Sequence, residues 1–228
     1  MYQSNVSIDF ESQTPTKDRI LNAAERLFAE HGFAATSLRM ITAEAKVNLA
    51  AVNYHFHSKD DLIVAVISRR IAPINARRLE LLNAAQAAAG EAAVPLEIVI
   101  RSFVSPLFSE STQAGEDARD IGRIVGRIYS DPSEGARRCF FELMRQVGRP
   151  FTEAFRRALP QISQVELVWR IHFSVGVMAH TLAGTHHLRA ISGGLCDTSD
   201  AAAVTGRIVA FVAAGMRAPV ATDGKQRS

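Results

Sequence analysis

The residues of this chain that could do chemistry are concentrated between Ala45 and Lys59. This segment has no Asp or Glu, and it carries two lysines and two histidines among small and polar side chains. A surface without carboxylates can approach phosphates without repulsion, and a few positioned cations then supply the salt-dependent part of binding. The chemistry that these residue types favour is recognition of double-stranded DNA.

Neighbouring side chains of the segment suit different parts of a DNA duplex. Ala50 and Ala51 are small enough to let a helix approach base edges, and their methyls can pack on thymine methyls. Asn53 can form two hydrogen bonds with adenine, whereas Tyr54 and His55 are better suited to phosphate oxygens. We therefore expect base readout and backbone contact from one helix.

Two short amphipathic helices precede this segment and must position it. Apolar residues at helical spacing predict a first helix over 16–31, capped by Thr14 or Thr16. A second helix is predicted over 38–45, and Thr36-Ser37 is its cap.

The DNA-reading helix itself is predicted to begin after the cap residue Asn48. On a helical wheel, Leu49, Val52 and Phe56 cluster on the inner side and Tyr54 lies nearly opposite. The alternative interpretation of the same pattern is an ordinary three-helix packing unit with an exposed tyrosine.

The next helix starts with a capping-box-like sequence, Ser58-Lys59-Asp60-Asp61. Its free N–H groups, together with Lys59, predict a phosphate-binding site at the helix N-terminus.

Composition narrows the class of protein but does not by itself indicate DNA. The 228 residues are 47% hydrophobic, and neither a run of eighteen apolar residues nor a secretion signal is present, so we expect a cytoplasmic protein without a membrane partner. Cys139 and Cys196 lack the spacing of a disulfide framework or a zinc site. The net charge is +3, and residues 1–60 hold six Lys/Arg against seven Asp/Glu. The net charge alone therefore does not identify residues 45–59 as a DNA-binding segment.

Several linked motifs over residues 16–66 resemble the N-terminal domain of the TetR family of transcriptional repressors. The motifs are ILNAAERLFAEHGF at 20–33, TSLR at 36–39, VNLAAVNYHF at 47–56 and SK at 58–59. The resemblance implies an all-α homodimer with a flexible N-terminal arm over 1–15 and a three-helix helix-turn-helix DNA-binding domain over 16–62. A larger ligand-binding and dimerisation domain of about six helices is then implied over 63–228.

The resemblance also implies roles for residues around the second and third helices. Base contacts are implied for Arg39, Leu49, Ala50 and Ala51, and backbone contacts for Tyr54, His55 and Lys59. With the capping and turn residues added, the predicted DNA-binding set is Ser37, Arg39, Lys46, Asn48, Leu49, Ala50, Ala51, Asn53, Tyr54, His55 and Lys59.

Two residues depart from the family pattern. Lys46 stands where the turn usually carries glycine, and we expect it to adopt the left-handed conformation at a cost of about 1 kcal/mol while adding a cation near DNA. Asn53 replaces the first tyrosine of a common aromatic pair. The operator preference is therefore expected to reside at these two positions. The string over 47–56 looks closest to a subgroup that responds to long-chain fatty acids, which implies a fatty acid or acyl-CoA effector.

The rest of the chain predicts long helices. One helix is expected over 60–82 with Pro73 as a kink or break. The Ala-rich stretch 83–94 is expected to be the end of this helix and a connection, and an unbroken Ala-rich helix is the alternative. An apolar helix over 96–108 is expected to be interrupted by Pro106. Further helices are predicted over 133–159, 165–188 and 201–217, with Gly193-Gly194 as the turn between the last two.

Arginines and phenylalanines of this region are the candidates for effector binding. Arg119, Arg123 and Arg127 recur at i, i+4 and i+8, so they share one face, which is either solvated or meets a ligand anion at the mouth of an apolar pocket. Phenylalanines can wall such a pocket, although core packing explains them equally well. The predicted ligand-binding set is Phe103, Phe108, Arg119, Arg123, Phe140 and His172.

Small residues on the last two helices predict how two copies of the chain pair. They allow helix axes to approach closely, as in a four-helix bundle made of two helices from each subunit. Burial against the same subunit is the alternative. The predicted dimer interface is Gly176, Ala179, Ala183, Gly184, Ala210 and Ala214.

An enzymatic function is weighed because four histidines lie on one predicted helix. His180 and His187 share a face, but seven residues of helix separate them by about 10 Å, which exceeds the span of one metal ion. The sequence has no HExxH, GxSxG or phosphate-loop motif. We expect no catalytic residue, metal or cofactor.

Three functional hypotheses follow from the sequence. The favoured one is a repressor that binds a palindromic operator as a homodimer and is released by a small apolar or acidic effector. The second is a helical lipid-binding or enzymatic module without specific DNA binding. The third is an architectural DNA-binding protein whose affinity no apolar acid changes.

Overall fold

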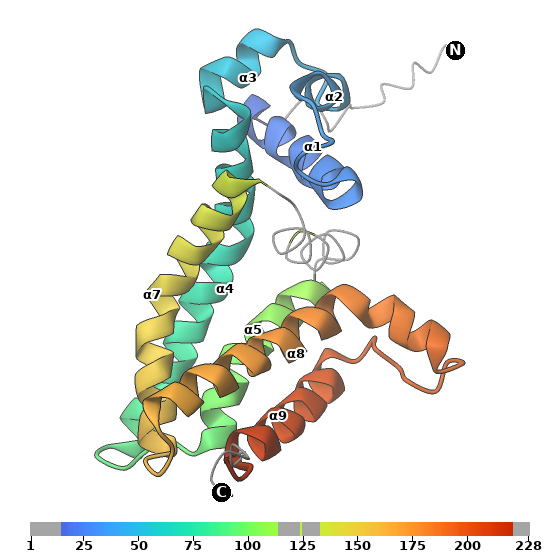
Figure 1. Cartoon of the computed structure of the whole chain (residues 1–228). Helices are drawn as coiled ribbons and strands as arrows, with labels where there is room; N and C mark the ends of the chain where they lie inside the picture. The colour runs from blue at the N-terminus through green and yellow to red at the C-terminus, as the bar shows by residue number, and fades with distance from the viewer. Residues whose placement is uncertain (1–14, 114–123, 125–132, 221–228) are drawn as a thin grey trace, which may run out of the picture.

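The computed structural model describes residues 15–113, 124 and 133–220, which form helices joined by short turns (Figure 1). No strand occurs within these ranges, so the predicted all-α fold is confirmed. Residues 1–14, the greater part of the predicted arm, lie outside the described residues, as do Arg119, Arg123 and Arg127. The helices are α1 (Thr16–His31), α2 (Leu38–Glu44), α3 (Leu49–Phe56), α4 (Lys59–Ala89), α5 (Leu96–Gln113), α7 (Glu134–Ala158), α8 (Gln164–Ile191) and α9 (Ala201–Arg217).

Side-chain caps begin most of the short helices at the predicted positions. Ser37 Oγ accepts the Met40 N–H at 3.2 Å, and Asn48 Oδ1 accepts the Ala51 N–H at 2.9 Å. These bonds satisfy donors that the first helical turn leaves without partners. The prediction that Thr14 or Thr16 caps α1 is wrong, because Pro15 occupies the capping position and no side chain caps that helix.

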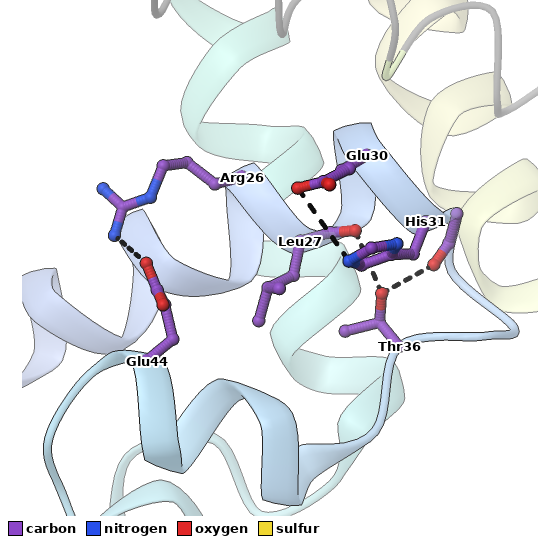
Figure 2. Close-up of polar contacts among 7 residues, drawn as sticks. Arg26, Leu27, Glu30, His31, Thr36 and Glu44 are labelled. Atoms are coloured by element: carbon purple, nitrogen blue, oxygen red, sulfur yellow. Dashed lines mark hydrogen bonds and ion pairs between the residues drawn. The ribbon is translucent and has the colours of Figure 1, made fainter.

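Two polar contacts hold α2 against α1 (Figure 2). The buried Thr36 hydroxyl donates to the carbonyls of Leu27, at 3.1 Å, and of Gly32, at 2.8 Å, so Thr36 ties the end of α1 to the start of α2. At the other end of α2, Arg26 and Glu44 form an exposed ion pair at 2.8 Å. Helix α2 is therefore attached to α1 at both of its ends.

Proline does not break the long helices. Helix α4 runs through Pro73 and through the Ala-rich stretch to Ala89, so the unbroken alternative is confirmed up to Gly90. Helix α5 likewise continues past Pro106, and the predicted interruption there is wrong. Each proline removes one helical hydrogen bond, but apolar residues on both sides of it are buried, such as Ile71 and Ile74 around Pro73. Burial of that face outweighs the lost bond.

The larger part of the molecule is built around α4 and α5 (Figure 1). Helix α7 runs alongside α4, α5 packs against α4 and α9, and α8 lies across α7 and α9. Glu97 on α5 and Arg217 on α9 form a two-pronged ion pair with distances of 2.5 and 3.0 Å. The hydrogen bond from Arg217 is also the main reason that the pKa of Glu97 is lowered.

In the described parts of the chain, no helix combines the length and the apolar character needed to cross a membrane.

Replacing Thr36 by Val should lower the free energy of unfolding by about 1–3 kcal/mol, because two carbonyls lose a buried hydroxyl donor. Urea denaturation followed by circular dichroism measures this. The matched control is Thr42→Val, whose hydroxyl donates only to the nearby Arg39 carbonyl at an exposed position and should change stability by about 0.5 kcal/mol or less. Equal losses in the two variants would contradict a special role for Thr36.

Candidate nucleic-acid interface and effector cavity

Helix α3 buries one side and exposes the other. Val52 and Phe56 are 1% and 4% exposed, whereas the Tyr54 side chain is 80% exposed. Leu49, which the helical wheel placed on the inner side, is 51% exposed, so that placement is wrong. The buried stripe begins at Val52, and Leu49 in the first turn extends past the core.

The other residues predicted to contact DNA are also accessible at this end of the molecule. Ser37 and Asn48 use their side-chain oxygens as helix caps, so they position α2 and α3. His55 is half-buried, and its ring lies edge-on to Tyr54 with centroids 5.1 Å apart. The exposed residues are Ser37, Arg39, Lys46, Asn48, Leu49, Ala50, Asn53 and Tyr54, and the half-buried ones are Ala51, His55 and Lys59.

The turn between α2 and α3 has the backbone conformation that the sequence predicts. Lys46 has φ of 53°, in the left-handed region that favours glycine, and its side chain is exposed. A second residue, His57, adopts φ of 52° at the end of α3. Sequence reasoning missed His57, because the passage from α3 into α4 carries no glycine or asparagine that would indicate a positive φ.

The start of α4 is capped by Ser58, and its Lys59 also contacts the turn after α1. Ser58 Oγ accepts the Asp61 N–H at 3.0 Å and donates to the Asp61 carboxylate at 2.6 Å. Lys59 Nζ donates to the Ala34 carbonyl at 3.3 Å. The predicted phosphate-binding cation therefore also links α4 to the start of the helix-turn-helix.

The electrostatics of the face follow from where the carboxylates are. The segment between Ala45 and Lys59 carries none. Of the three acids that flank it, Glu44 pairs with Arg26 and Asp61 accepts the Ser58 hydroxyl, while Asp60 is exposed in the first turn of α4. A phosphate approaching α3 therefore meets cations and neutral groups first.

A large apolar cavity of about 800 Å³ lies between α4, α5, α7 and α8. This volume falls in the range of cavities that hold small molecules, roughly 300–1,000 Å³. Of the predicted ligand-binding residues, Phe103, Phe140 and His172 line it, whereas Phe108 is buried in the core and does not. Arg119 and Arg123 lie outside the described residues.

Arg78 is the one Arg or Lys among the described residues that line this cavity, and sequence reasoning missed it. Its side chain is buried; Nε donates to the Phe103 carbonyl at 2.8 Å, Nη1 donates to Asn75 Oδ1 at 3.0 Å, and the guanidinium lies 4.1 Å from the Phe103 ring centre. The sequence did hold a signal, because Arg78 interrupts an apolar stripe of Ile71, Ile74 and Leu82 at helical spacing.

Four of the six residues predicted to form the dimer interface, Gly176, Ala183, Ala210 and Ala214, are exposed in the single chain. Gly176, Ala179 and Ala183 line the cavity. Ala210 and Ala214 on α9 are exposed beside Phe211, which is 69% exposed. Gly184 is half-buried.

Near its start, helix α8 exposes large apolar side chains rather than small ones. Trp169 and Phe173 are 54% and 60% exposed, and their rings stack with centroids 5.6 Å apart. Val165 and Val168 are exposed beside them.

Reactive groups elsewhere do not assemble into a second site among the described residues. Within those ranges no three His, Cys, Asp or Glu side chains are grouped so that they could hold a metal ion. Burial raises the pKa of the Cys139 thiol, which therefore stays protonated and unreactive near neutral pH.

Comparison with curated proteins finds transcriptional regulators. The chain is 32% identical over 110 residues to the repressor NicS of Pseudomonas putida, an alignment that covers 46% of this chain and 52% of NicS. It is 42% identical over 53 residues to the regulator UidR of Escherichia coli, covering 23% of this chain and 27% of UidR. The chain thus matches between a quarter and about half of the length of these relatives.

Comparison with solved structures finds the same fold over nearly the whole chain. FadR from Bacillus subtilis in complex with stearoyl-CoA has a TM-score of 0.64 at 13% identity and covers 87% of this chain and 98% of that structure. The fatty acid degradation regulator FadR from Bacillus halodurans has a TM-score of 0.63 at 14% identity, with 91% and 99% covered.

Two family descriptions match consecutive parts of the chain. Residues 20–66, which contain most of α1 and all of α2 and α3, match the bacterial regulatory proteins of the tetR family. Residues 101–215, half of the chain, match the Tetracyclin repressor-like C-terminal domain and include most of the helices around the cavity. With both parts matched in order, and with a capped, carboxylate-free α3 on one and an apolar cavity in the other, this chain belongs to the TetR family.

Proposed function

We propose that this protein is a transcriptional repressor that binds a palindromic DNA operator as a homodimer and releases it when a small molecule occupies the cavity. The observation that carries the proposal is the exposed face of α3. Ala50, Asn53 and Tyr54 project from a helix that buries Val52 and Phe56 and is capped by Asn48. The named regulators among its relatives support the same function.

We assign base readout and backbone contact to different residues of this face. Arg39 on α2 is exposed and long enough to reach a guanine edge, while Ala50 and Asn53 on α3 are short and suit a helix lying deep in the major groove. Tyr54, Lys46 and Lys59 flank them and suit phosphate oxygens, which fix the register without reading sequence.

Substitution of Arg39 and of Tyr54 should separate these two roles. After selection of a preferred duplex from a random library, Arg39→Ala should lose about 1–3 kcal/mol of discrimination at one base pair of each half-site. Tyr54→Ala should weaken all duplexes by a similar factor. Fluorescence anisotropy with the preferred duplex and its single-base-pair variants measures both effects.

The control for this experiment is Arg77→Ala, because Arg77 is an exposed arginine of α4 that pairs with Glu80. It should leave DNA affinity unchanged. Equal losses at every sequence for Arg39→Ala and Tyr54→Ala would show that Arg39 contacts phosphate only. If the wild-type protein selects no duplex at all, the repressor function is excluded, and the alternative of a helical lipid-binding or enzymatic module is favoured.

The cavity supports an elongated apolar effector with a polar end, and we propose a fatty acid or acyl-CoA. Phenylalanines and methionines make up much of its wall, among them Phe103, Phe140, Phe151, Met144 and Met178. Arg78 and the two histidines His172 and His180 are the basic side chains that the described residues place at it. The similarity in fold to a regulator bound to stearoyl-CoA agrees with this class of ligand.

Filling the cavity at Gly148 should block an acyl chain without harming the fold. Gly148 lines the cavity from α7, and a Cβ added there would meet no atom within 4 Å. Gly148→Leu therefore adds volume inside the cavity and also gains up to about 1 kcal/mol of helix propensity. We expect palmitoyl-CoA affinity, measured by calorimetry, to fall about tenfold or more, and DNA release by palmitoyl-CoA to fall with it.

The matched control is Gly148→Ala, which changes the backbone propensity in the same direction but adds only a methyl group. It should retain most of the palmitoyl-CoA affinity. If Gly148→Leu binds palmitoyl-CoA as the wild type does, the acyl chain lies elsewhere. If palmitoyl-CoA binds the wild type but never changes its DNA affinity, the protein is a DNA-binding protein without this effector.

The homodimer is proposed to form through the exposed apolar side chains of α8 and α9. Phe211, Ala210 and Ala214 supply the α9 part, and Trp169 and Phe173 supply the α8 part. Large apolar side chains gathered on two neighbouring helices are typical of a protein interface, and a second copy of the chain would cover them.

Phe211→Asp should convert the dimer into a monomer in sedimentation experiments at micromolar concentration, because a carboxylate would be buried in the apolar contact. The control is Ile98→Asp, at an exposed position of α5 away from this face, which should leave the dimer intact. A dimer that survives Phe211→Asp would exclude this part of α9 from the interface.

A further inference from the structure

A buried carboxylate joins α1 to α4 at the base of the DNA-reading helices. The Glu25 side chain is 3% exposed, and its two oxygens accept hydrogen bonds from two consecutive arginines of α4. Arg69 donates at 2.5 Å to Glu25 Oε2 and at 2.9 Å to Asn22 Oδ1, and Arg70 Nε donates to Glu25 Oε1. We refer to Asn22, Glu25, Arg69 and Arg70 as the clamp.

The clamp fixes the orientation of α1 relative to α4 and also holds the two helices together. Apolar packing of α1 on Ile63, Val66 and Ile67 lets the helices slide or rotate by small amounts, because such contacts are not directional. Ion pairs that use both carboxylate oxygens have a fixed geometry, and breaking one leaves a buried charge at high cost. The orientation of α1 relative to α4 therefore depends on Glu25.

The backbone hydrogen bonding of α4 is interrupted directly after the clamp. Pro73 has no N–H, so the carbonyl of Arg69 loses its helical donor. Helix α7 contacts α4 on both sides of Pro73. Before Pro73 the Cys139 thiol of α7 makes only long polar contacts, with Ser68 at 3.8 Å and with the Val64 carbonyl at 3.9 Å. Beyond Pro73 the attachment is by short hydrogen bonds: Asn75 donates to the Leu143 carbonyl of α7 at 2.9 Å, and Arg78 to the Phe103 carbonyl of α5 at 2.8 Å. One helix thus has two polar attachments with a weakened backbone position between them.

We propose that Glu25 is the positioning residue of the DNA-reading unit, and that this unit is a rigid body made of α1 to α3 and residues 59–71 of α4, ending at Pro73. This boundary differs from residue 62, which the sequence resemblance implies as the end of the DNA-binding domain. The consequence rests on the proposed dimeric DNA-binding function: in a dimer, the clamp sets the separation and angle of the two α3 helices. Glu25 touches no base or phosphate and acts through this geometry.

The test compares two operators that differ only in half-site spacing. Inserting one base pair between the half-sites moves them by about 3.4 Å and turns them by about 34°. The wild type should discriminate strongly against the longer operator, and Glu25→Gln should reduce the ratio of the two dissociation constants about tenfold, because its α3 helices are less well fixed. Arg69→Gln keeps the contact between Arg70 and Glu25, so it should reduce the ratio by a smaller factor. This variant replaces Glu25→Gln in the test if Glu25→Gln does not fold.

This ratio separates positioning from simple loss of stability. A variant that is partly unfolded binds both operators less well by the same factor, so an unchanged ratio in both clamp variants would overturn the proposal. The matched control is Glu44→Gln, which breaks the exposed Arg26–Glu44 pair between α1 and α2 (Figure 2) and should leave the ratio unchanged.

A measurement without DNA keeps the inference testable if the proposed function fails. In a background of Cys139→Ser and Cys196→Ser, spin labels at Lys17 and Val64 report the distance from α1 to α4 by electron–electron resonance. Glu25→Gln should broaden this distance distribution, and an unchanged width would overturn the clamp.

A second label pair tests where the rigid body ends. Labels at Val64 and Ala84 span Pro73 on α4, and their distance distribution should narrow in Pro73→Ala, which restores the helical hydrogen bond to the Arg69 carbonyl. Equal widths with and without Pro73 would place the end of the unit elsewhere.

Discussion

Helix α3 is only eight residues long, and a helix of that length does not hold together alone in water. Its stability comes from two buried side chains, Val52 and Phe56, and from the Asn48 cap. Val52 and Phe56 lie on the side of the helix that faces away from the proposed DNA-contacting residues. The residues on the exposed side do not contribute to the packing of the helix. Residues as different as Ala50, Asn53 and Tyr54 can therefore occupy it.

The cavity imposes the opposite constraint, because a folded protein normally fills its apolar interior. About 800 Å³ between α4, α5, α7 and α8 is left open, and the packing contacts that side chains would make there are absent. Gly148 and Gly176 have room for a larger residue, so backbone crowding does not explain them. A ligand with apolar surface would restore these contacts, and the free energy gained would be available to shift the helices that line the cavity.

Local signals in the sequence predicted the DNA-reading half well, and long-range packing limited the rest. Caps at Ser37, Asn48 and Ser58 and the left-handed Lys46 depend on neighbours a few residues away, so they could be read from spacing alone. The continuation of α4 and α5 through proline could not, because tertiary burial decides it. The cavity could not be predicted from the small residues of α8 for the same reason: Gly176, Ala179 and Ala183 line it opposite α7, which is distant in sequence.

The two polar clusters of α4 address a problem that a long, mostly apolar interface creates. A helix of 31 residues packed through Ile, Val and Leu has several rotations and shifts of similar energy. Glu25 with its two arginines admits one arrangement at the DNA end, and Asn75 with Arg78 admits one at the cavity end, because a shifted helix would leave these buried polar groups without their partners. Buried polar residues on α4 therefore contribute alignment more than stability. Alignment is what the proposed function requires, because a change in the cavity would have to reach the α3 helices of a dimer.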